Sequence, residues 1–351
     1  MKKILFIIGG LALMVIIYMG INVTRASGAF INPTPTDNQL CQAVDVFPGT
    51  EDVTIDQNTG MVFVSAANRR VPNGGTPDQG GIYAFPIDDP SSVRKVSIDG
   101  PADFQPHGIS LWRGDRGDGT IITRLFVINH ATTGENHIEL FDVAADGSLS
   151  YFESIQFQDL TSPNDILAVG PSSFYATIDR KYKNGLMASL EAYLALPLAS
   201  TVYFDGFEGF TAVEGLKYAN GINMSADGNI VYIAEVLRRE IGVYARTPAS
   251  GALKYIKSIP VDTGPDNIEV GGDGSLYVAG HPYVFEFLKH AEDAAHISPS
   301  QVLKINPATD QVDTIFMDDQ GLINAASVGA PYGDKLIIGA VFDGHVLVCA
   351  K

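Results

Sequence analysis

The sequence predicts an all-β fold, a six-bladed β-propeller, because one pattern recurs six times along the chain. A short polar motif precedes a β-rich run each time, and the six motifs are marked by Glu51, His107, Asn164, Asn220, Asn267 and Ser327. Most motifs are followed by a turn signal such as Asp227-Gly228 and then by a hydrophobic strand, which is typical of hairpins. Units of about 50 residues that are nearly all β are typical of propeller blades.

The repeat accounts for most of the chain, so we expect residues 39–351 to form a single domain. In a propeller, the first strand of each blade lines a central channel. Helical content should therefore be low. We expect only two short helical segments, over 187–198 and 284–297, as lids over one face.

The first residues predict a targeting segment. Two lysines precede an apolar run over 4–23 that contains no charged residue. At about 1.5 Å per residue this run can cross a hydrocarbon core of about 30 Å, whereas secretory signals usually have about 7–15 apolar residues and a small-residue cleavage site. We therefore predict an uncleaved signal anchor over 1–26, a tether over 27–38 and an extracytoplasmic globular part. Secretion after cleavage is the alternative.

The chain has 2 cysteines, Cys41 at the start of the globular part and Cys349 near its end. Two cysteines are too few for a disulfide scaffold, a zinc ribbon or an iron–sulfur cluster. Outside the cytoplasm they would form a disulfide bond, which would close the ring of blades. The alternative is two separate buried thiols.

Composition excludes several classes of function. The formal net charge is −17, and so acidic a chain would repel nucleic acid. The sequence also lacks the Gly-x-Ser-x-Gly motif of many serine hydrolases. Nothing in it indicates an obligate protein partner.

The six motifs predict a ring of polar side chains around the axis of the propeller. Its members are carboxylates, amides, a histidine and a serine: Glu51, Asp52, His107, Asn164, Asp165, Asn220, Asp266, Asn267 and Ser327. Carboxylate and amide oxygens are the ligands that calcium prefers. Burying them unpaired would cost several kcal/mol each, so the pattern predicts that a bound cation satisfies them.

These motifs resemble the paraoxonase/arylesterase family, and the resemblance covers residues 38–351. It rests on specific blocks, namely Glu51-Asp52, Pro106–Ser110, Val127–His130, Pro163–Thr177, Ala219–Glu235, Asp266–Pro282 and Lys335–Gly344. Both cysteines also match in position. The resemblance implies two calcium ions within a six-bladed propeller. It also implies hydrolysis of small-molecule lactones and aryl esters.

The resemblance implies ligands for both ions, residue by residue. The catalytic calcium would bind Glu51, Asn164, Asn220, Asp266 and Asn267. The structural calcium would bind Asp52, Asp165 and the backbone carbonyl of Ile109. The family's histidine dyad maps to His107 and His130, and a further active-site histidine maps to His281.

The implied mechanism is attack of water on the carbonyl carbon of the substrate. Calcium would bind the carbonyl oxygen, and His107, helped by His130, would take a proton from the water, with Asp266 as the alternative base. Two other functions stay open: a sugar-lactonase or strictosidine-synthase-like enzyme, and a binding propeller that holds calcium only as a plug. The adjacent ligand pairs Glu51-Asp52 and Asn164-Asp165 argue against the sugar-lactonase-like enzyme. His107 argues against the binding propeller.

Overall fold

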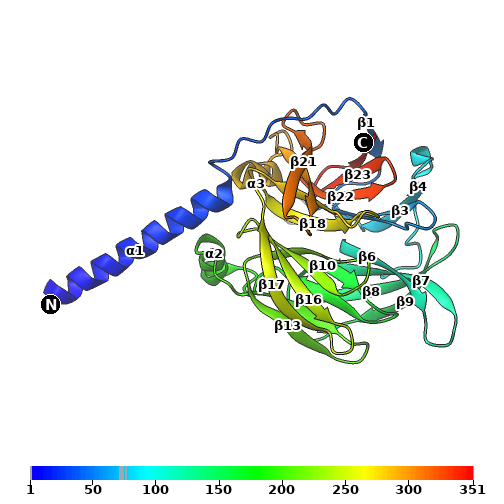
Figure 1. Cartoon of the computed structure of the whole chain (residues 1–351), viewed down its shortest axis with the longest axis horizontal. Coiled ribbons are helices and arrows are strands. Elements are labelled where there is room, and N and C mark those ends of the chain that lie inside the picture. Colours follow the sequence, from blue (N-terminus) through cyan, green and yellow to red (C-terminus); the bar gives the residue numbers. More distant parts are fainter. Residues whose placement is uncertain (1, 71–74, 76, 351) are drawn as a thin grey trace.

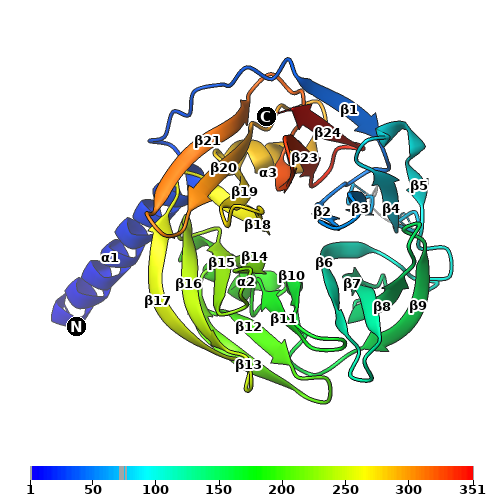
Figure 2. The ribbon, with the colours of Figure 1, turned by 45° about the vertical axis from the view of Figure 1, so that its right-hand side comes forward.

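The computed structural model describes residues 2–70, 75 and 77–350. Six four-stranded antiparallel sheets surround a central axis, so the predicted all-β, six-bladed propeller is confirmed (Figure 2). The sheets follow one another around the axis in chain order. This arrangement brings the starts of six distant segments together at the axis.

The strands of each sheet are given from the axis outward and can be followed in Figures 1 and 2. The first sheet has β2 (Asp52–Ile55), β3 (Met61–Ala66), β4 (Gly81–Pro86) and β5 (Arg94–Lys95). The second has β6 (Pro106–Asp115), β7 (Ile121–His130), β8 (Asn136–Val143) and β9 (Leu149–Ile155). The third has β10 (Pro163–Ala168), β11 (Phe174–Ile178), β12 (Ala199–Phe204) and β13 (Gly209–Leu216).

The fourth sheet has β14 (Ala219–Met224), β15 (Ile230–Glu235), β16 (Glu240–Thr247) and β17 (Ala252–Pro260). The fifth has β18 (Gly264–Val270), β19 (Leu276–His281), β20 (Ser300–Asn306) and β21 (Gln311–Asp318). The sixth has β22 (Ala326–Tyr332), β23 (Lys335–Ala340), β24 (His345–Ala350) and β1 (Cys41–Asp45). A short 3₁₀ helix covers Pro90–Ser92.

The sixth sheet closes the ring, because it combines the first strand of the chain with the last three. β1 pairs antiparallel with β24, and Cys41 lies opposite Cys349 in the register. The sulfur atoms of these two residues are bonded, so the predicted disulfide is confirmed. Backbone hydrogen bonds and one covalent bond therefore join the two ends of the propeller.

Apolar side chains fill the spaces between neighbouring sheets. Phe126 and Ile128 of β7, for example, pack with Ile166 of β10 and Phe174 of β11 in one fully buried cluster. Five further clusters are formed in the same way around the ring. Because each sheet is held on both faces, the inner strands have fixed positions from which to present polar side chains.

In the part of the chain that the structure describes, three α-helices lie outside the sheets. α1 (Lys2–Ser27) projects away from the propeller (Figure 1). Its segment Gly9–Ser27 is long and apolar enough to cross a membrane, a test that a signal sequence near the N-terminus also passes. The other two, α2 (Gly185–Tyr193) and α3 (Val284–Glu292), confirm the two short helical segments.

Both short helices end earlier than expected. We expected helix over 187–198, but α2 ends at Tyr193, and Pro197 follows within four residues. A proline disfavours helical geometry in the residue before it and cannot donate a backbone hydrogen bond. For the segment expected over 284–297, the backbone of Asp293 is extended, which ends α3 at Glu292.

The C-terminal end of α1 contacts the propeller near both short helices. Asn22 Nδ2 donates to the carbonyl oxygen of Leu194, 3.0 Å away, just after α2. Arg239 Nη1 donates to the carbonyl oxygen of Ala26 at 3.2 Å and to that of Pro282 at 3.4 Å. The end of α1 is therefore fixed beside the strand that carries His281.

Breaking the disulfide should destabilise the propeller. We expect Cys349→Ser to lower the melting temperature, because loss of a native disulfide typically costs roughly 2–5 kcal/mol. The double variant Cys41→Ser/Cys349→Ser is the matched control and should melt with the single variant, since both lack the same bond. Thermal unfolding followed by circular dichroism measures this, and an unchanged melting temperature would show that β1 closes the ring without the covalent bond.

Candidate metal centre and active site

The polar motifs lie where β-bulges redirect the inner strands. Pairing shifts register within the motif in five of the six inner strands, namely β6, β10, β14, β18 and β22. A bulge inserts an extra residue and re-aims nearby side chains. The strands also approach closely, since a Cβ atom at Gly108 would lie 2.6 Å from the carbonyl oxygen of Asn164. Adjacent residues such as Asn164 and Asp165 can therefore both face the interior.

Four buried oxygen atoms near the axis have no hydrogen-bond partner among the described residues. They belong to four of the five predicted ligands of the catalytic calcium: Glu51 Oε2, Asn164 Oδ1, Asn220 Oδ1 and Asn267 Oδ1. We call them the oxygen cluster. Buried polar atoms are normally satisfied, and leaving one unpaired costs about 1–3 kcal/mol. Four such atoms, three on the inner strands of different sheets and one on the residue just before β2, fit a hard cation that prefers oxygen ligands.

Glu51 connects the oxygen cluster to the neighbouring polar groups. Asn267 Nδ2 donates to Glu51 Oε1 at 3.1 Å, and the Ser327 hydroxyl donates to the Glu51 carbonyl oxygen at 2.5 Å. His107 Nε2 lies 3.6 Å from Oε1, and Arg69 Nη2 lies 4.0 Å from Oε2. Burial raises the pKa of Glu51 to about 7, against the lowering effect of Arg69. The carboxylate therefore lacks full compensation within the protein.

The two histidines of the predicted dyad are adjacent but have separate partners. Their ring centroids are 4.9 Å apart, with the planes at 76°. Nδ1 of His107 lies 3.0 Å from Arg69 Nη2, whereas Nδ1 of His130 lies 2.9 Å from Asn136 Oδ1. Burial lowers the pKa of both rings and Arg69 lowers it further, whereas the hydrogen bond with Asn136 partly raises the pKa of His130.

The third predicted histidine pairs with the fifth predicted ligand. His281 Nε2 lies 3.0 Å from Asp266 Oδ2, and both side chains are buried. The His281 ring also stacks on Phe287 of α3, with centroids 4.2 Å apart. Its Nδ1 atom is buried and has no partner among the described residues. This Asp–His pair is therefore a second group that can accept or donate a proton beside the oxygen cluster.

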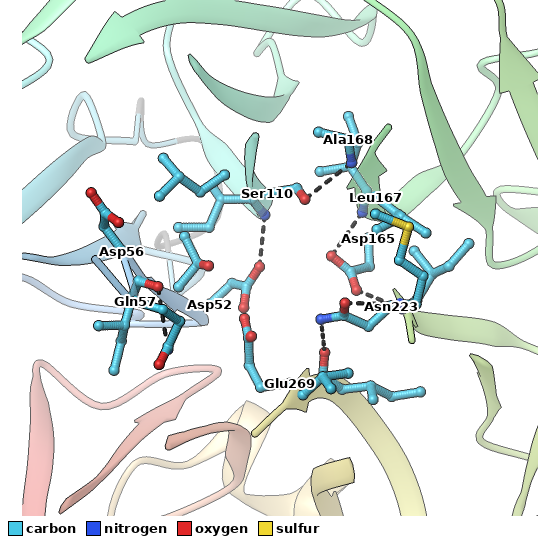
Figure 3. A pocket seen from close by; sticks show the side chains of 18 of the residues that line it. Asp52, Asp56, Gln57, Ser110, Asp165, Leu167, Ala168, Asn223 and Glu269 are labelled. Carbon is cyan, nitrogen blue, oxygen red and sulfur yellow. Dashed lines mark hydrogen bonds between the residues drawn. The ribbon is translucent and has the colours of Figure 1, made fainter. Parts of the chain in front are cut away.

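The residues predicted to hold the structural calcium line a separate cavity of about 250 Å³ (Figure 3). Asp52 Oδ2 accepts a hydrogen bond from the backbone amide of Ile109 at 2.6 Å. Asp165 accepts one from Ile222 and one from Ile166, each at 2.7 Å. Burial and like charges raise the pKa of Asp52 and Asp165 well above the ordinary value.

Two further carboxylates that line this cavity were not predicted as ligands, Asp56 and Glu269. Figure 3 shows the side chain of Glu269 beside that of Asp52. Burial raises the pKa of Glu269 to about 8. The strand alternation could have found it, because Glu269 lies two residues after Asn267 and such residues share a face of a strand. Arg69 was also missed, since it lies in a Gly- and Pro-rich loop without a periodic pattern.

In the described residues, no three His, Cys, Asp or Glu side chains form a group that could hold a metal ion. The predicted catalytic site draws three of its five ligands from asparagine amides, and the structural site includes a backbone carbonyl. A cation at either position would therefore depend on neutral oxygen atoms as well as carboxylates, which is common for calcium.

Comparison with known proteins identifies similar sequences over nearly the whole chain. The arylesterase family model matches residues 27–350. Serum paraoxonase/arylesterase 2 of Rattus norvegicus is 31% identical over 321 residues, covering 86% of this chain and 85% of the relative. Serum paraoxonase/arylesterase 1 of Homo sapiens is 33% identical over 322 residues, covering 88% of each chain.

Solved structures with similar folds share less sequence. A luciferin-regenerating enzyme is 14% identical with a TM-score of 0.55, covering 91% of this chain and 96% of that chain. A putative gluconolactonase is 16% identical with a TM-score of 0.54, covering 88% and 91%. The calcium-binding protein regucalcin from Agrobacterium tumefaciens is 14% identical with a TM-score of 0.51, covering 88% and 92%. At these identities the similarity concerns the fold alone.

The buried carboxylates should make the metal-free chain less stable as pH rises. Folding raises the pKa of Glu51 to about 7 and that of Glu269 to about 8, from 4.5. Their protonated forms are favoured in the folded state, so this stability is full below about pH 4.5 and is lost as pH rises through about 8. We therefore expect the melting temperature in EDTA to fall between pH 5 and pH 8.

The variant Glu269→Gln tests the cause, because it removes one of the crowded carboxylates. In EDTA it should melt above the wild type at pH 8 but not at pH 5. Glu153→Gln, which changes an exposed carboxylate on β9, is the control and should follow the wild type at both values. If the melting temperature of the metal-free wild type instead rose from pH 5 to pH 8, the carboxylates would be compensated without a cation.

Proposed function

The chain belongs to the arylesterase family, and we propose that it is a calcium-dependent hydrolase of lactones and aryl esters. The observation that carries the proposal is the oxygen cluster, in which four buried atoms lack partners among the described residues. The relatives are named as paraoxonases and arylesterases, which supports ester chemistry at this site.

Two calcium ions are part of the proposal. The first would be held by Glu51, Asn164, Asn220, Asp266 and Asn267, four of which supply the oxygen cluster. The second would be held by Asp52, Asp165 and the backbone carbonyl of Ile109. When bound, the first ion would supply a Lewis acid for the substrate carbonyl oxygen, and the second would stabilise the fold by compensating buried charge.

The chain's own residues supply the proton chemistry and the walls of the site. His107 lies beside Glu51 and is in contact with His130, whereas Asp266 and His281 form a second buried pair. Either group could accept a proton from the attacking water. Phe287 packs against His281 and contributes an apolar surface beside this pair.

We further propose that the propeller lies outside the cytoplasm and that α1 anchors it in a membrane, with secretion after cleavage as the alternative. Two lysines precede the apolar helix, which favours a cytoplasmic N-terminus. The disulfide between Cys41 and Cys349 supports an oxidising compartment.

Hydrolytic activity is the direct test. We expect the calcium-loaded chain to hydrolyse members of a panel of γ- and δ-lactones and phenyl acetate, measured by acid release or by phenol absorbance. Activity should disappear with a chelator and return when calcium is added. A protein that bound calcium by calorimetry but hydrolysed no member of the panel would be a binding propeller and not an enzyme.

Substitutions should separate the two proposed ions. Asn220→Ala removes a first-site ligand, and we expect kcat/KM to fall by more than roughly 100-fold, because even outer-shell changes at metal sites cost about 10–100-fold. Asp52→Ala should instead mainly lower the melting temperature in calcium. Asn229→Ala, in an exposed turn, is the control for the first variant. An unchanged melting temperature in Asp52→Ala would contradict the assignment of a structural ion.

A further inference from the structure

We propose that Arg180, oriented by Tyr218, binds a carboxylate on the substrate. The chain would then prefer lactones and esters that carry a negative charge over uncharged ones of the same size. The inference rests on the proposed function, because it names the substrate class of the same site.

Arg180 lies between the starts of two inner strands that carry the oxygen cluster. Its Nη2 atom donates to the hydroxyl of Tyr218 at 2.8 Å, and Tyr218 immediately precedes β14. On the other side, Asp179 pairs with Arg180 and accepts a hydrogen bond at 2.6 Å from the hydroxyl of Ser162, which immediately precedes β10. The second residue of each of these strands is an asparagine of the oxygen cluster. Arg180 therefore lies at the end of the axis that holds this cluster.

Arg180 and Tyr218 also lie within electrostatic range of two other sheets. Burial and Arg69 are the main causes of the lowered pKa of His107 on the second sheet, and the charge of Arg180 adds to them. Burial is the main cause of the raised pKa of Tyr218, and Asp266 on the fifth sheet adds to it. Since influence reaches both sheets across the axis, the pair borders the channel.

The guanidinium of Arg180 is fixed in place before any ligand arrives. Nε donates to Asp179 Oδ1 at 3.0 Å, and Nη2 donates to Oδ2 at 2.7 Å. The side chain of Asp179 is 6% exposed, whereas that of Arg180 is 37% exposed. Glu191 of α2 accepts hydrogen bonds from the backbone amides of Lys181 and Tyr182, which fixes the following segment. The buried carboxylate thus anchors the pair, and the guanidinium is the part that faces solvent.

One end of this guanidinium is available to a ligand. Nη1 of Arg180 makes no hydrogen bond within the part of the chain that the structure describes. Arg69 differs, because its Nη1 donates to the carbonyl oxygens of Gly49 and Ala67 and its Nη2 to that of Pro106. A guanidinium presents N–H donors in a planar fork that matches a carboxylate. Arg180 can therefore bind such a group, whereas Arg69 is already engaged.

Tyr218 has an unusual backbone conformation for a tyrosine. Its φ is +59°, in the left-handed region that favours glycine. Residues are held in such conformations only where the surrounding structure imposes them, and they are frequent at functional sites. Here the conformation accompanies the hydrogen bond to Arg180 Nη2. Tyr218 thus engages one end of the guanidinium and leaves the Nη1 end for the substrate.

The segment around Arg180 is basic in an otherwise acidic chain. Lys181 and Lys183 are exposed, so three of the four residues over 180–183 are basic, whereas the formal net charge of the chain is −17. A local concentration of one charge attracts ligands of the opposite charge. An anionic substrate therefore gains both attraction toward this segment and a charge-assisted hydrogen bond, and an uncharged substrate gains neither.

Two pairs of substrates test the preference, and within each pair a carboxylate is replaced by an amide of similar size. They are 4-acetoxybenzoate with 4-acetoxybenzamide, and 5-oxotetrahydrofuran-2-carboxylate with its primary amide. For the calcium-loaded full chain at low ionic strength, we expect kcat/KM for at least one carboxylate to exceed that for its amide by about ten-fold or more. Added sodium chloride should lower this ratio, because salt screens the attraction between charges.

Variants assign the preference to Arg180. Arg180→Met should lower the ratio of carboxylate to amide by about ten-fold, mainly through a higher KM for the carboxylate. Arg180→Lys keeps the charge and should recover part of the ratio. Tyr218→Phe removes one hydroxyl but keeps the Asp179–Arg180 pair, so its ratio should be intermediate. Arg116→Met is the matched control and should keep the wild-type ratio, because Arg116 also pairs with an aspartate but lies in an exposed hairpin.

Equal kcat/KM for carboxylate and amide in both pairs would overturn the inference, as would an Arg180→Met variant that folds and keeps the wild-type ratio. If Arg180→Met does not fold, the wild-type ratio, its salt dependence and Tyr218→Phe decide the question. Hydrolysis of phenyl acetate without a preference for carboxylates would remove this inference and leave the proposed function standing. Absence of all hydrolysis would overturn both.

Discussion

The buried oxygen atoms at the axis are the constraint on which the rest of this structure depends. Each inner strand is interrupted by a bulge or begins at the motif, and these interruptions turn carboxylates and amides inward. Side chains that could satisfy one another are scarce there, because the ring supplies mainly acceptor oxygens. The fold therefore concentrates acceptor oxygen atoms at the axis, where Arg69 compensates part of the charge of Glu51 and a bound cation would compensate more.

Closure of the ring holds these buried oxygen atoms close together. In an open ring of blades, the inner strands could move apart and separate their polar side chains. Here β1 and β24 join the two ends of the propeller by hydrogen bonds and by the disulfide. The apolar clusters between sheets then resist any spreading of the inner strands. Rigid packing at the periphery thus supports an electrostatically unfavourable centre, which is the arrangement expected of a preorganised site.

The sequence predicted the fold and most of the axial ring because both are encoded by repetition. Six similar motifs implied six equivalent strands, and equivalence implied a shared axis. The helix ends were less predictable, since α2 stops where Pro197 and local hydrogen bonding intervene. Arg69 could not be predicted at all. It reaches His107 from a loop, and only the folded positions of Gly49, Ala67 and Pro106 show which carbonyls receive its guanidinium.

The two ends of the axial ring differ in chemistry although they are built from neighbouring residues. Around the oxygen cluster, carboxylates are mixed with amides, three histidines and the cation Arg69. The cavity is lined by the carboxylates of Asp52, Asp56, Asp165 and Glu269 and by the guanidinium of Arg113. An ion at the cavity would therefore be bound mainly by charge, whereas the oxygen cluster leaves more ligand positions neutral. Neutral ligands compensate less of a cation's charge, so an ion there would keep more of its power to polarise a substrate carbonyl.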